Sequence, residues 1–169
     1  MRRLLLNLAF VAVPLDSRGA QRRYSTLRHF SEVRDRHLLT VELKLLGASS
    51  LLGLAQIIAA SHAASLQRGY RWTGSARDEP VPPLTGIAGR LQRSQVNFLE
   101  SFPLFAALLL ADHLAGRNGA LTLWGAHLYF WGRLAYVPLY VSGIPIIRSL
   151  AWNVAAVGIL LLAVALFAG

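Results

Sequence analysis

Four apolar stretches, each about as long as the hydrocarbon core of a bilayer is thick, recur between residues 41 and 168. A transmembrane helix needs about 20 apolar residues to cross roughly 30 Å of hydrocarbon. We therefore predict helical spans at residues 41–66, 90–115, 120–141 and 145–168. Hydrophobic residues make up 54% of the chain and charged residues only 15%, which argues against an ordinary soluble domain. The predicted fold is an all-α, integral membrane four-helix bundle.

The first 38 residues do not share this pattern. They contain an apolar run that is too short to span a membrane, followed by an arginine-rich stretch with few acids. A targeting presequence and a start codon assigned too far upstream both explain such a segment. Arginine outnumbers lysine sixteen to one, as expected of a GC-rich genome, in which spurious upstream extensions arise easily. This bias favours the explanation that the start codon is assigned too far upstream. We treat residues 1–38 as an N-terminal extension and residues 39–169 as the membrane domain.

The net charge of +9 does not predict nucleic-acid binding, because eight of the sixteen arginines lie before residue 37. No basic face interleaved with aromatic residues remains in the rest of the sequence. The sequence has no cysteine, so any thiol chemistry needs a thiol from a ligand. His62, His113 and His127 lie in or beside different spans without ligand spacing, and we predict no metal site.

Arginines in the loops predict the orientation in the membrane. The loop at residues 67–89 holds Arg68, Arg71 and Arg77, and Arg148 flanks the third loop, whereas the second loop holds only Arg117. Cytoplasmic loops carry an excess of lysine and arginine, so we predict that the first and third loops are cytoplasmic. A bacterial inner membrane is the expected location, and a mitochondrial or endoplasmic reticulum membrane is the alternative.

The second span carries polar residues in "RLQRSQVNFLESFPLF", residues 90–105. At 100° per residue, Arg90, Arg93, Asn97 and Glu100 fall within an arc of about 80° on one face of the helix. Each of them alone could be a residue that reaches the headgroups or bonds a neighbouring helix. Aligned groups that are costly in lipid instead indicate a shared polar cavity.

The third span repeats the pattern, with Arg133, Tyr136 and Tyr140 at i, i+3 and i+7, and the fourth begins with Arg148 and Ser149. Guanidinium groups outnumber carboxylates in this predicted cavity. Because arginine forks suit carboxylates, the expected guest is an anion with one cationic group. A small peptide with two carboxylates and one ammonium group fits this description.

The segment "RSQVNFLESFPLF" resembles, closely and in order, a second-helix motif of the MAPEG superfamily, R-x-Q-x-N-x-x-E-x-x-P-x-F. This superfamily includes microsomal glutathione transferases, prostaglandin E synthase and leukotriene synthase. "GRLAYVPLY" and "RSLAW" resemble its third-helix and fourth-helix motifs, and the loop "ARDEPVPPLTG" is similar to that of small bacterial members. The resemblance implies a homotrimer surrounded by membrane lipid, with glutathione bound as cosubstrate between neighbouring subunits.

The resemblance also implies roles for individual residues. The glutathione-binding positions come from the second and third spans: Arg93, Gln95, Asn97, Glu100, Arg133, Tyr136 and Tyr140. Glu100 would meet the ammonium group of glutathione, and Arg133 would support the tyrosines or the adjacent fold. A first-loop arginine, Arg68 or Arg71, would join them.

Arg148 and Ser149 would lie beside the glutathione sulfur as the catalytic residues. A free thiol has a pKa near 8.5, and a nearby cation lowers an acid's pKa by about 1 to 3 units. The nucleophilic thiolate would then rise to roughly a quarter of the thiol or more at neutral pH. This implies a transferase or peroxidase that acts on lipophilic electrophiles from the bilayer.

Trp152 departs from the family pattern, because some family enzymes carry a tyrosine one turn after the fourth-helix arginine. An indole cannot act as a phenol. The alternative hypothesis is therefore a non-catalytic membrane protein of the same fold. Such a protein would bind glutathione or another small anion, or would use the polar residues for trimer packing.

Overall fold

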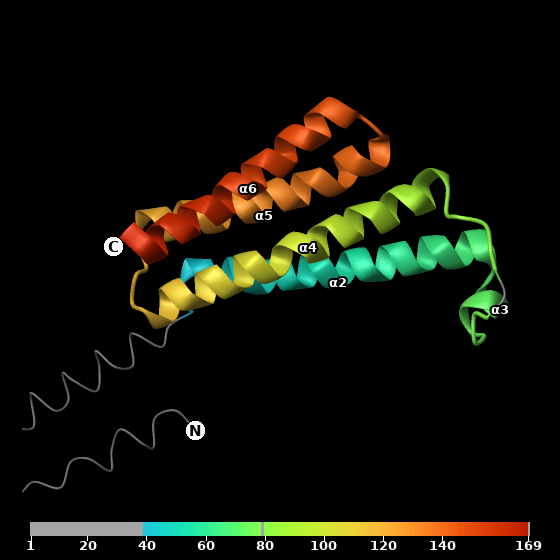
Figure 1. The fold of residues 1–169 in the computed structure, drawn as a ribbon, viewed down its shortest axis with the longest axis horizontal. Coiled ribbons are helices and arrows are strands. Elements are labelled where there is room, and N and C mark those ends of the chain that lie inside the picture. Colours follow the sequence, from blue (N-terminus) through green and yellow to red (C-terminus); the bar gives the residue numbers. More distant parts are fainter. Residues whose placement is uncertain (1–38, 79, 169) are drawn as a thin grey trace, which may run out of the picture. The chain divides into compact units, whose positions relative to one another are not determined.

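The computed structural model describes residues 39–78 and 80–168, and the predicted extension at residues 1–38 lies outside them. The described part is all-helical, as predicted, and contains no strand. Its four long helices run side by side, and a short helix lies in the first loop (Figure 1). These helices are α2 (Val41–Arg68), α3 (Tyr70–Thr73), α4 (Gly86–Leu114), α5 (Ala120–Ser142) and α6 (Pro145–Ala168).

Helices α2, α4 and α6 are long and apolar enough to cross a membrane. They correspond to three of the four predicted spans, and α4 begins four residues earlier than predicted. Helix α5 has 23 residues and matches the predicted third span in position, but it is not among the helices that meet this criterion. The reason is its content of tryptophan, tyrosine, histidine and arginine, which lowers its mean hydropathy.

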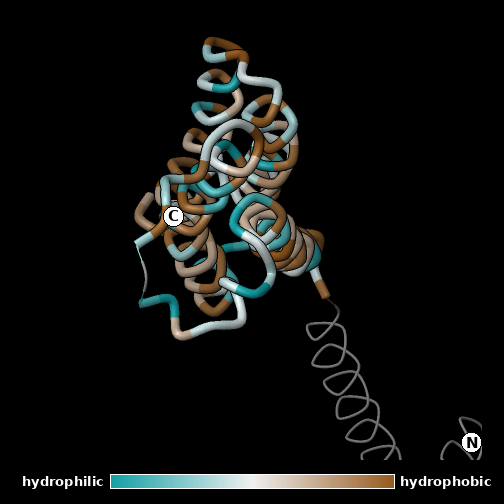
Figure 2. The backbone as a smooth tube through the Cα atoms, turned by 90° about the vertical axis from the view of Figure 1, so that its right-hand side faces the viewer, coloured by the Kyte–Doolittle hydropathy of each residue, from teal (hydrophilic) through white to brown (hydrophobic). Residues whose placement is uncertain are grey.

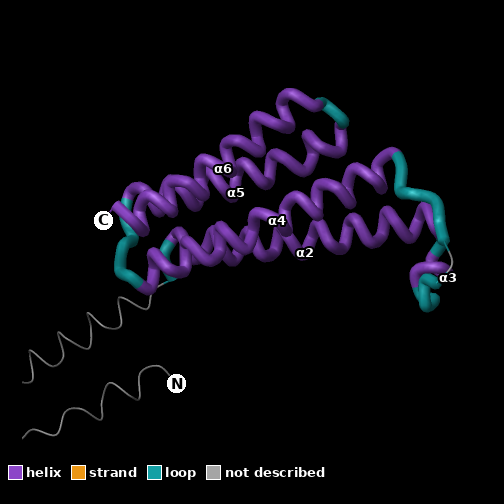
Figure 3. The backbone as a smooth tube through the Cα atoms, viewed as in Figure 1, coloured by secondary structure: helices purple, strands orange, loops and turns teal. Residues whose placement is uncertain are grey.

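Two helix boundaries have a clear local cause. The Thr40 hydroxyl accepts a hydrogen bond from the Leu43 amide at the start of α2, over 3.4 Å. Gly143 ends α5 in the left-handed region at φ 81°, where a glycine avoids the clash of a β-carbon. Only residues 143 and 144 separate α5 from α6 (Figure 3). This turn and the α2–α4 loop lie at the same end of the four long helices (Figure 1).

Helices α5 and α6 pack closely because glycines remove side chains from their interface. A β-carbon on Gly158 of α6 would lie 2.6 Å from the carbonyl oxygen of Gly125 and 2.7 Å from the backbone nitrogen of Tyr129. A β-carbon on Gly132 would lie 3.0 Å from the carbonyl oxygen of Ala151. The two backbones therefore approach as small residues allow in membrane helix pairs.

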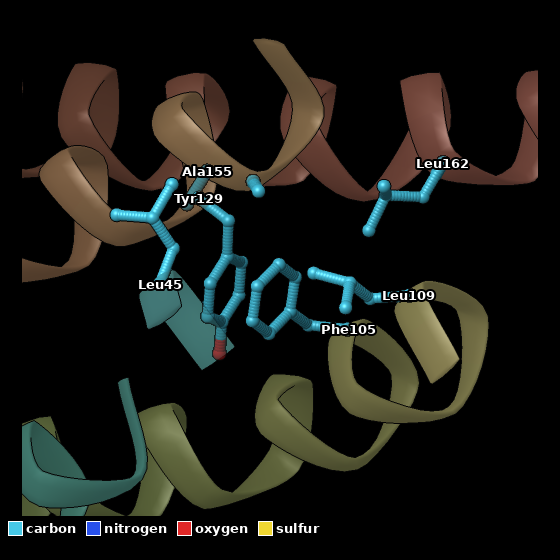
Figure 4. Close-up of a cluster of buried hydrophobic side chains, with 7 residues drawn as sticks. Leu45, Phe105, Leu109, Tyr129, Ala155 and Leu162 are labelled. Carbon is cyan, nitrogen blue, oxygen red and sulfur yellow. The ribbon is translucent and has the colours of Figure 1, made fainter. Parts of the chain in front are cut away.

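An aromatic stack forms the centre of the core. The rings of Phe105 on α4 and Tyr129 on α5 are parallel, with centroids 3.8 Å apart. Figure 4 shows these two rings with aliphatic side chains from α2, α4 and α6 around them. The buried members of this cluster are Leu45, Phe105, Leu109, Ala126, Tyr129, Ala155 and Leu162. All four long helices thus contribute to one core.

Large apolar side chains also cover the outside of the helices. Leu51, Leu110, Leu160 and Phe167 are all exposed, and they come from α2, α4 and α6. Hydrophobic positions are spread through the helices, with hydrophilic positions among them (Figure 2). An outer surface of this kind suits contact with lipid or with another helix.

Candidate functional site

Arg133 bridges α5 and α4 in the interior, where its side chain is only 2% exposed. Its Nη1 donates to Oδ1 of Asn97 over 2.7 Å, and its Nη2 donates to the hydroxyl of Ser101. The guanidinium also lies 5.7 Å from the Tyr129 ring centre and 5.5 Å from that of Tyr136. Arg133 therefore fixes Asn97 with its amide nitrogen left as the donor for another partner.

Arg148 lies in the first turn of α6 and faces the end of α5. Its guanidinium is 4.5 Å from the ring centre of Tyr140, a geometry in which cation and ring attract. The rings of Tyr140 and Tyr136 meet edge to face at 5.3 Å. The three side chains therefore form one continuous wall.

A crevice of about 270 Å³ opens along this wall, and we call it the polar crevice. Side chains from α4, α5 and α6 line it: Asn97, Tyr136, Tyr140, Arg148, Ser149, Trp152 and Asn153. The structure thus brings together five of the predicted site residues, namely Asn97, Tyr136, Tyr140, Arg148 and Ser149.

A second crevice of about 360 Å³ adjoins the first, and we call it the apolar crevice. Its lining comes from the same three helices: Asn97, Glu100, Ser101, Leu104, Arg133, Trp152, Ala156, Ile159 and Leu160. Asn97 and Trp152 line both crevices. A polar ligand in one crevice would therefore adjoin an apolar ligand in the other at Trp152.

Ser149 and Trp152 offer limited proton chemistry here. The Ser149 hydroxyl donates to the carbonyl oxygen of Pro145 over 3.0 Å, so its proton is engaged by its own helix. Asn153 donates through Nδ2 to the carbonyl oxygen of Ser149. Trp152 is 40% exposed and brings only an indole N–H. The positive charge in the polar crevice comes from Arg148.

Arg93 and Glu100, on the predicted polar face of α4, are both exposed. Glu100 lines the apolar crevice from α4, whereas Arg93 is not among the residues lining any of the crevices described above. A β-carbon on Gly89, one turn earlier, would lie 3.2 Å from Nη1 of Arg93. Both charged side chains are thus accessible to a ligand or another molecule.

Gln95 lies apart from these residues. It is two positions from Asn97, so at 100° per residue the two side chains leave α4 about 160° apart, on nearly opposite faces. Gln95 lines a third crevice of about 230 Å³ with Arg68, Trp72 and Arg77. We call this the loop crevice, and the polar crevice shares no lining residue with it. The single chain therefore presents the predicted site residues in two separate places.

Arg68, which the sequence left as one of two choices, has a defined place in the loop crevice. Its guanidinium lies 4.9 Å from the ring centre of Trp72, and Nη2 donates to the carbonyl oxygen of Pro82. Arg77 faces the same ring at 5.7 Å. Nε of Arg68 and Nε1 of Trp72 are buried and have no hydrogen-bond partner among the described residues. Arg71 does not line this crevice.

Sequence reasoning missed several lining residues. Ser101 contacts Arg133 and also Tyr129, whose hydroxyl lies 3.2 Å from the Ser101 hydroxyl. Its position one helical turn after Asn97 was a usable signal. Asn153 stands one turn after Ser149 in the same way. The roles of Trp72 and Arg77 depend on how the first loop folds, which helix periodicity does not predict.

Comparison with known proteins supports one assignment. No curated protein matches the sequence. A family model described as MAPEG family matches residues 45–168, which is most of the chain and contains all the crevices described above. Together with the three membrane-length apolar helices, this match shows an integral membrane protein. The chain belongs to the MAPEG family.

Proposed function

We propose that this protein binds glutathione in the polar crevice and transfers it to lipophilic electrophiles, or uses it to reduce lipophilic hydroperoxides. The observation that carries the proposal is the position of Arg148. Its guanidinium stands over Tyr140 in a polar crevice that adjoins an apolar one at Trp152. A charged cosubstrate and an apolar substrate could thus meet beside a single cation.

The charges of the site fit glutathione, which has two carboxylates and one ammonium group. Arg148 in the polar crevice can pair with a carboxylate or with a thiolate. Arg93 and Glu100 are exposed on α4 one turn before and one turn after Asn97, outside the polar crevice, where they can meet the other carboxylate and the ammonium group of a ligand that extends along α4. The amide nitrogen of Asn97 has no hydrogen-bond partner among the described residues, and it adds a neutral donor for the peptide. Charge-assisted bonds of this kind contribute about 1.5–3 kcal/mol each.

Arg148 would favour the thiolate over the thiol. The guanidinium cannot lose its proton in a protein, so it remains a cation next to the sulfur. The amino-terminal end of α6, where Arg148 lies, adds the positive end of the helix dipole. The thiol proton leaves to solvent, and the thiolate can then attack an electrophilic carbon.

Both reactions need only glutathione and the lipophilic substrate. With an aryl chloride, a carbon–sulfur bond forms, the carbon–chlorine bond breaks, and chloride leaves with the bonding pair. With a hydroperoxide, two glutathione molecules supply two electrons and two protons, which gives an alcohol, water and glutathione disulfide. Leu104, Ile159 and Leu160 in the apolar crevice suit the lipophilic part of either substrate.

A homotrimer would explain why the predicted site residues lie in two separate crevices. In this proposal each subunit crosses the membrane with four helices, α5 among them. Gln95 and Arg68 face a different side of the protomer from Arg148. In a ring of three, the loop crevice of one subunit can face the polar crevice of its neighbour. Gln95 and Arg68 would then complete the glutathione site, and the exposed apolar side chains would face partner helices or lipid. The arginine-rich end would lie on the cytoplasmic side, in a bacterial inner membrane.

Mixed oligomers test the shared site. Gln95→Ala and Arg148→Ala variants should each lose turnover alone. Coexpressed in equal amounts, they should regain about a quarter of the wild-type activity, because a quarter of the sites in a cyclic assembly would draw both intact residues from different subunits. Activity no higher than the mean of the separate variants would show that each site lies within one chain.

A non-catalytic glutathione-binding protein is the second candidate. The engaged hydroxyl of Ser149 and the indole of Trp152 favour it, because neither supplies a phenol-like proton donor near Arg148. Such a protein would bind glutathione but would leave electrophiles and hydroperoxides unchanged.

Turnover of a chloronitrobenzene with glutathione separates the two candidates. The purified wild-type protein should show glutathione-dependent product formation. Arg148→Ala should reduce this rate by about 100-fold, which corresponds to about 2.7 kcal/mol of lost transition-state stabilisation. Circular dichroism and thermal unfolding would establish that the variant is folded. Glutathione binding without turnover of any electrophile or hydroperoxide would favour the second candidate.

A further inference from the structure

Arg90 shares the polar face of α4 but makes a contact of its own at the end of α5. Its Nη1 donates to the carbonyl oxygen of Val141 over 2.7 Å, and the side chain is partly buried. Val141 belongs to the last turn of α5, where backbone carbonyl groups lack the amide partner that a continuing helix would supply. A cation at a helix carboxyl end also interacts favourably with the helix dipole. Arg90 therefore caps α5 from a different helix.

Gly143 provides the space that this cap occupies. A β-carbon at residue 143 would lie 2.9 Å from Nη1 and 3.1 Å from Cζ of Arg90. Gly143 also has φ of 81°, which an L side chain rarely adopts. The guanidinium thus packs directly on the turn that joins α5 to α6.

That turn connects the two helices that carry Tyr140 and Arg148. Tyr140 lies three residues before Gly143, and Arg148 lies five residues after it, in the first turn of α6. Both side chains line the polar crevice together with Asn97 of α4. A bond from α4 to the turn therefore limits how far Tyr140 and Arg148 can move away from Asn97.

We propose that Arg90 is a positioning residue for Arg148: by holding the α5–α6 turn against α4, it keeps the Arg148 guanidinium beside the bound sulfur. This inference rests on the proposed function. Arg90 itself does not line the polar crevice, so its effect passes through the turn.

Arg117 is a matched control at the opposite end of the protein. Its Nη1 donates to the carbonyl oxygen of Leu166 over 2.7 Å and so caps α6 in the way that Arg90 caps α5. Both side chains are partly buried, and both bonds join helix carbonyls to arginines distant in sequence. Arg117 does not line the polar crevice, and its bond holds the carboxyl end of α6 rather than the turn between α5 and α6.

The experiment compares Arg90→Gln and Arg117→Gln in the purified full-length protein. Thermal unfolding measures stability, and the ultraviolet absorbance of the thiolate against pH gives the pKa of the bound glutathione thiol. Affinity for S-methylglutathione, which has no ionisable thiol, separates peptide binding from thiolate stabilisation. Both variants should unfold at lower temperatures than the wild type.

Only Arg90→Gln should raise the pKa of the bound thiol, by about one unit toward the free value, with about a tenfold loss of thiolate below that pKa. Its affinity for S-methylglutathione should stay within about threefold of the wild type, and Arg90→Lys should restore part of the pKa shift because lysine keeps a donor for Val141. An unchanged thiol pKa in Arg90→Gln, or an equal rise in Arg117→Gln, would overturn the positioning role. Wild-type protein that binds no glutathione at all would overturn the proposed function and this inference with it.

Discussion

Helix α5 meets α6 and α4 through two interfaces of opposite character. Toward α6 it presents Gly125 and Gly132, and the two backbones nearly touch at Gly158. Toward α4 it presents Arg133, which fills the interior and bonds Asn97 and Ser101. Both crevices of the candidate site open where α4 faces α5 and α6.

The two interfaces therefore suit different roles: the α5–α6 interface suits rigid packing, and the α4–α5 interface suits ligand binding. Backbone contact at glycines leaves no room for a ligand, so the α5–α6 pair can act as a rigid unit. An interface held by long polar side chains leaves spaces between them and carries groups that can bind charge. Substitutions in the first interface should therefore reduce stability alone, whereas those in the second should also reduce ligand binding.

The largest effect is expected for Gly158→Ala. Its β-carbon would lie 2.6 Å from the Gly125 carbonyl oxygen, so the two helices must separate. We expect the free energy of unfolding to fall by about 3 kcal/mol, as in strong overpacking, with glutathione affinity of the folded fraction within about threefold of the wild type. Denaturant unfolding in detergent would measure the change.

Gly47→Ala is the matched control for this substitution, because Gly47 is helical and exposed. Among the described residues, no atom outside its own helix backbone lies within 4 Å of its β-carbon position. It should leave stability unchanged or raise it by up to about 1 kcal/mol through helix propensity. Equal unfolding transitions for the two variants would contradict the close packing of α5 against α6.

A smaller loss of stability but a larger loss of binding is expected for Arg133→Met. Methionine keeps much of the side-chain length but removes the donors to Asn97 and Ser101, and an unpaired buried acceptor costs about 1–3 kcal/mol. We expect about 2 kcal/mol lower stability and about tenfold weaker glutathione binding, because Asn97 loses its orientation. The same unfolding assay and calorimetry would measure both. Full affinity in the variant would show that Arg133 serves packing alone.

The long helices were predictable because their signal is local. Hydropathy and length placed α6 at residues 145–168 and α2 at its observed start. The polar face of α4 was also predicted from periodicity, but its residues make different contacts in the structure. Asn97 turns to Arg133 and Arg90 to Val141, while Arg93 and Glu100 stay exposed. A helical wheel assigns a face, whereas partners depend on how the neighbouring helices pack.

Sequence reasoning could not place Gln95 and the first loop. Gln95 belongs to the quoted α4 motif, yet it faces the loop crevice with Arg68 and Trp72. The fold of this loop depends on long-range contacts such as Gln67 Nε2 donating to the Thr85 hydroxyl over 3.1 Å. Such contacts leave no periodic signal in the sequence. The apolar crevice escaped prediction for the same reason, since it depends on the separation between α4 and α6.

Calorimetric titration of glutathione into the detergent-solubilised protein tests the central claim most directly. The wild-type protein should bind glutathione, and Arg93→Ala and Glu100→Gln should each weaken binding by about tenfold or more through loss of one charge-assisted contact. A glutathione analogue without its amino group should bind the wild type and Glu100→Gln equally. Unchanged glutathione affinity in both variants would contradict the proposed site.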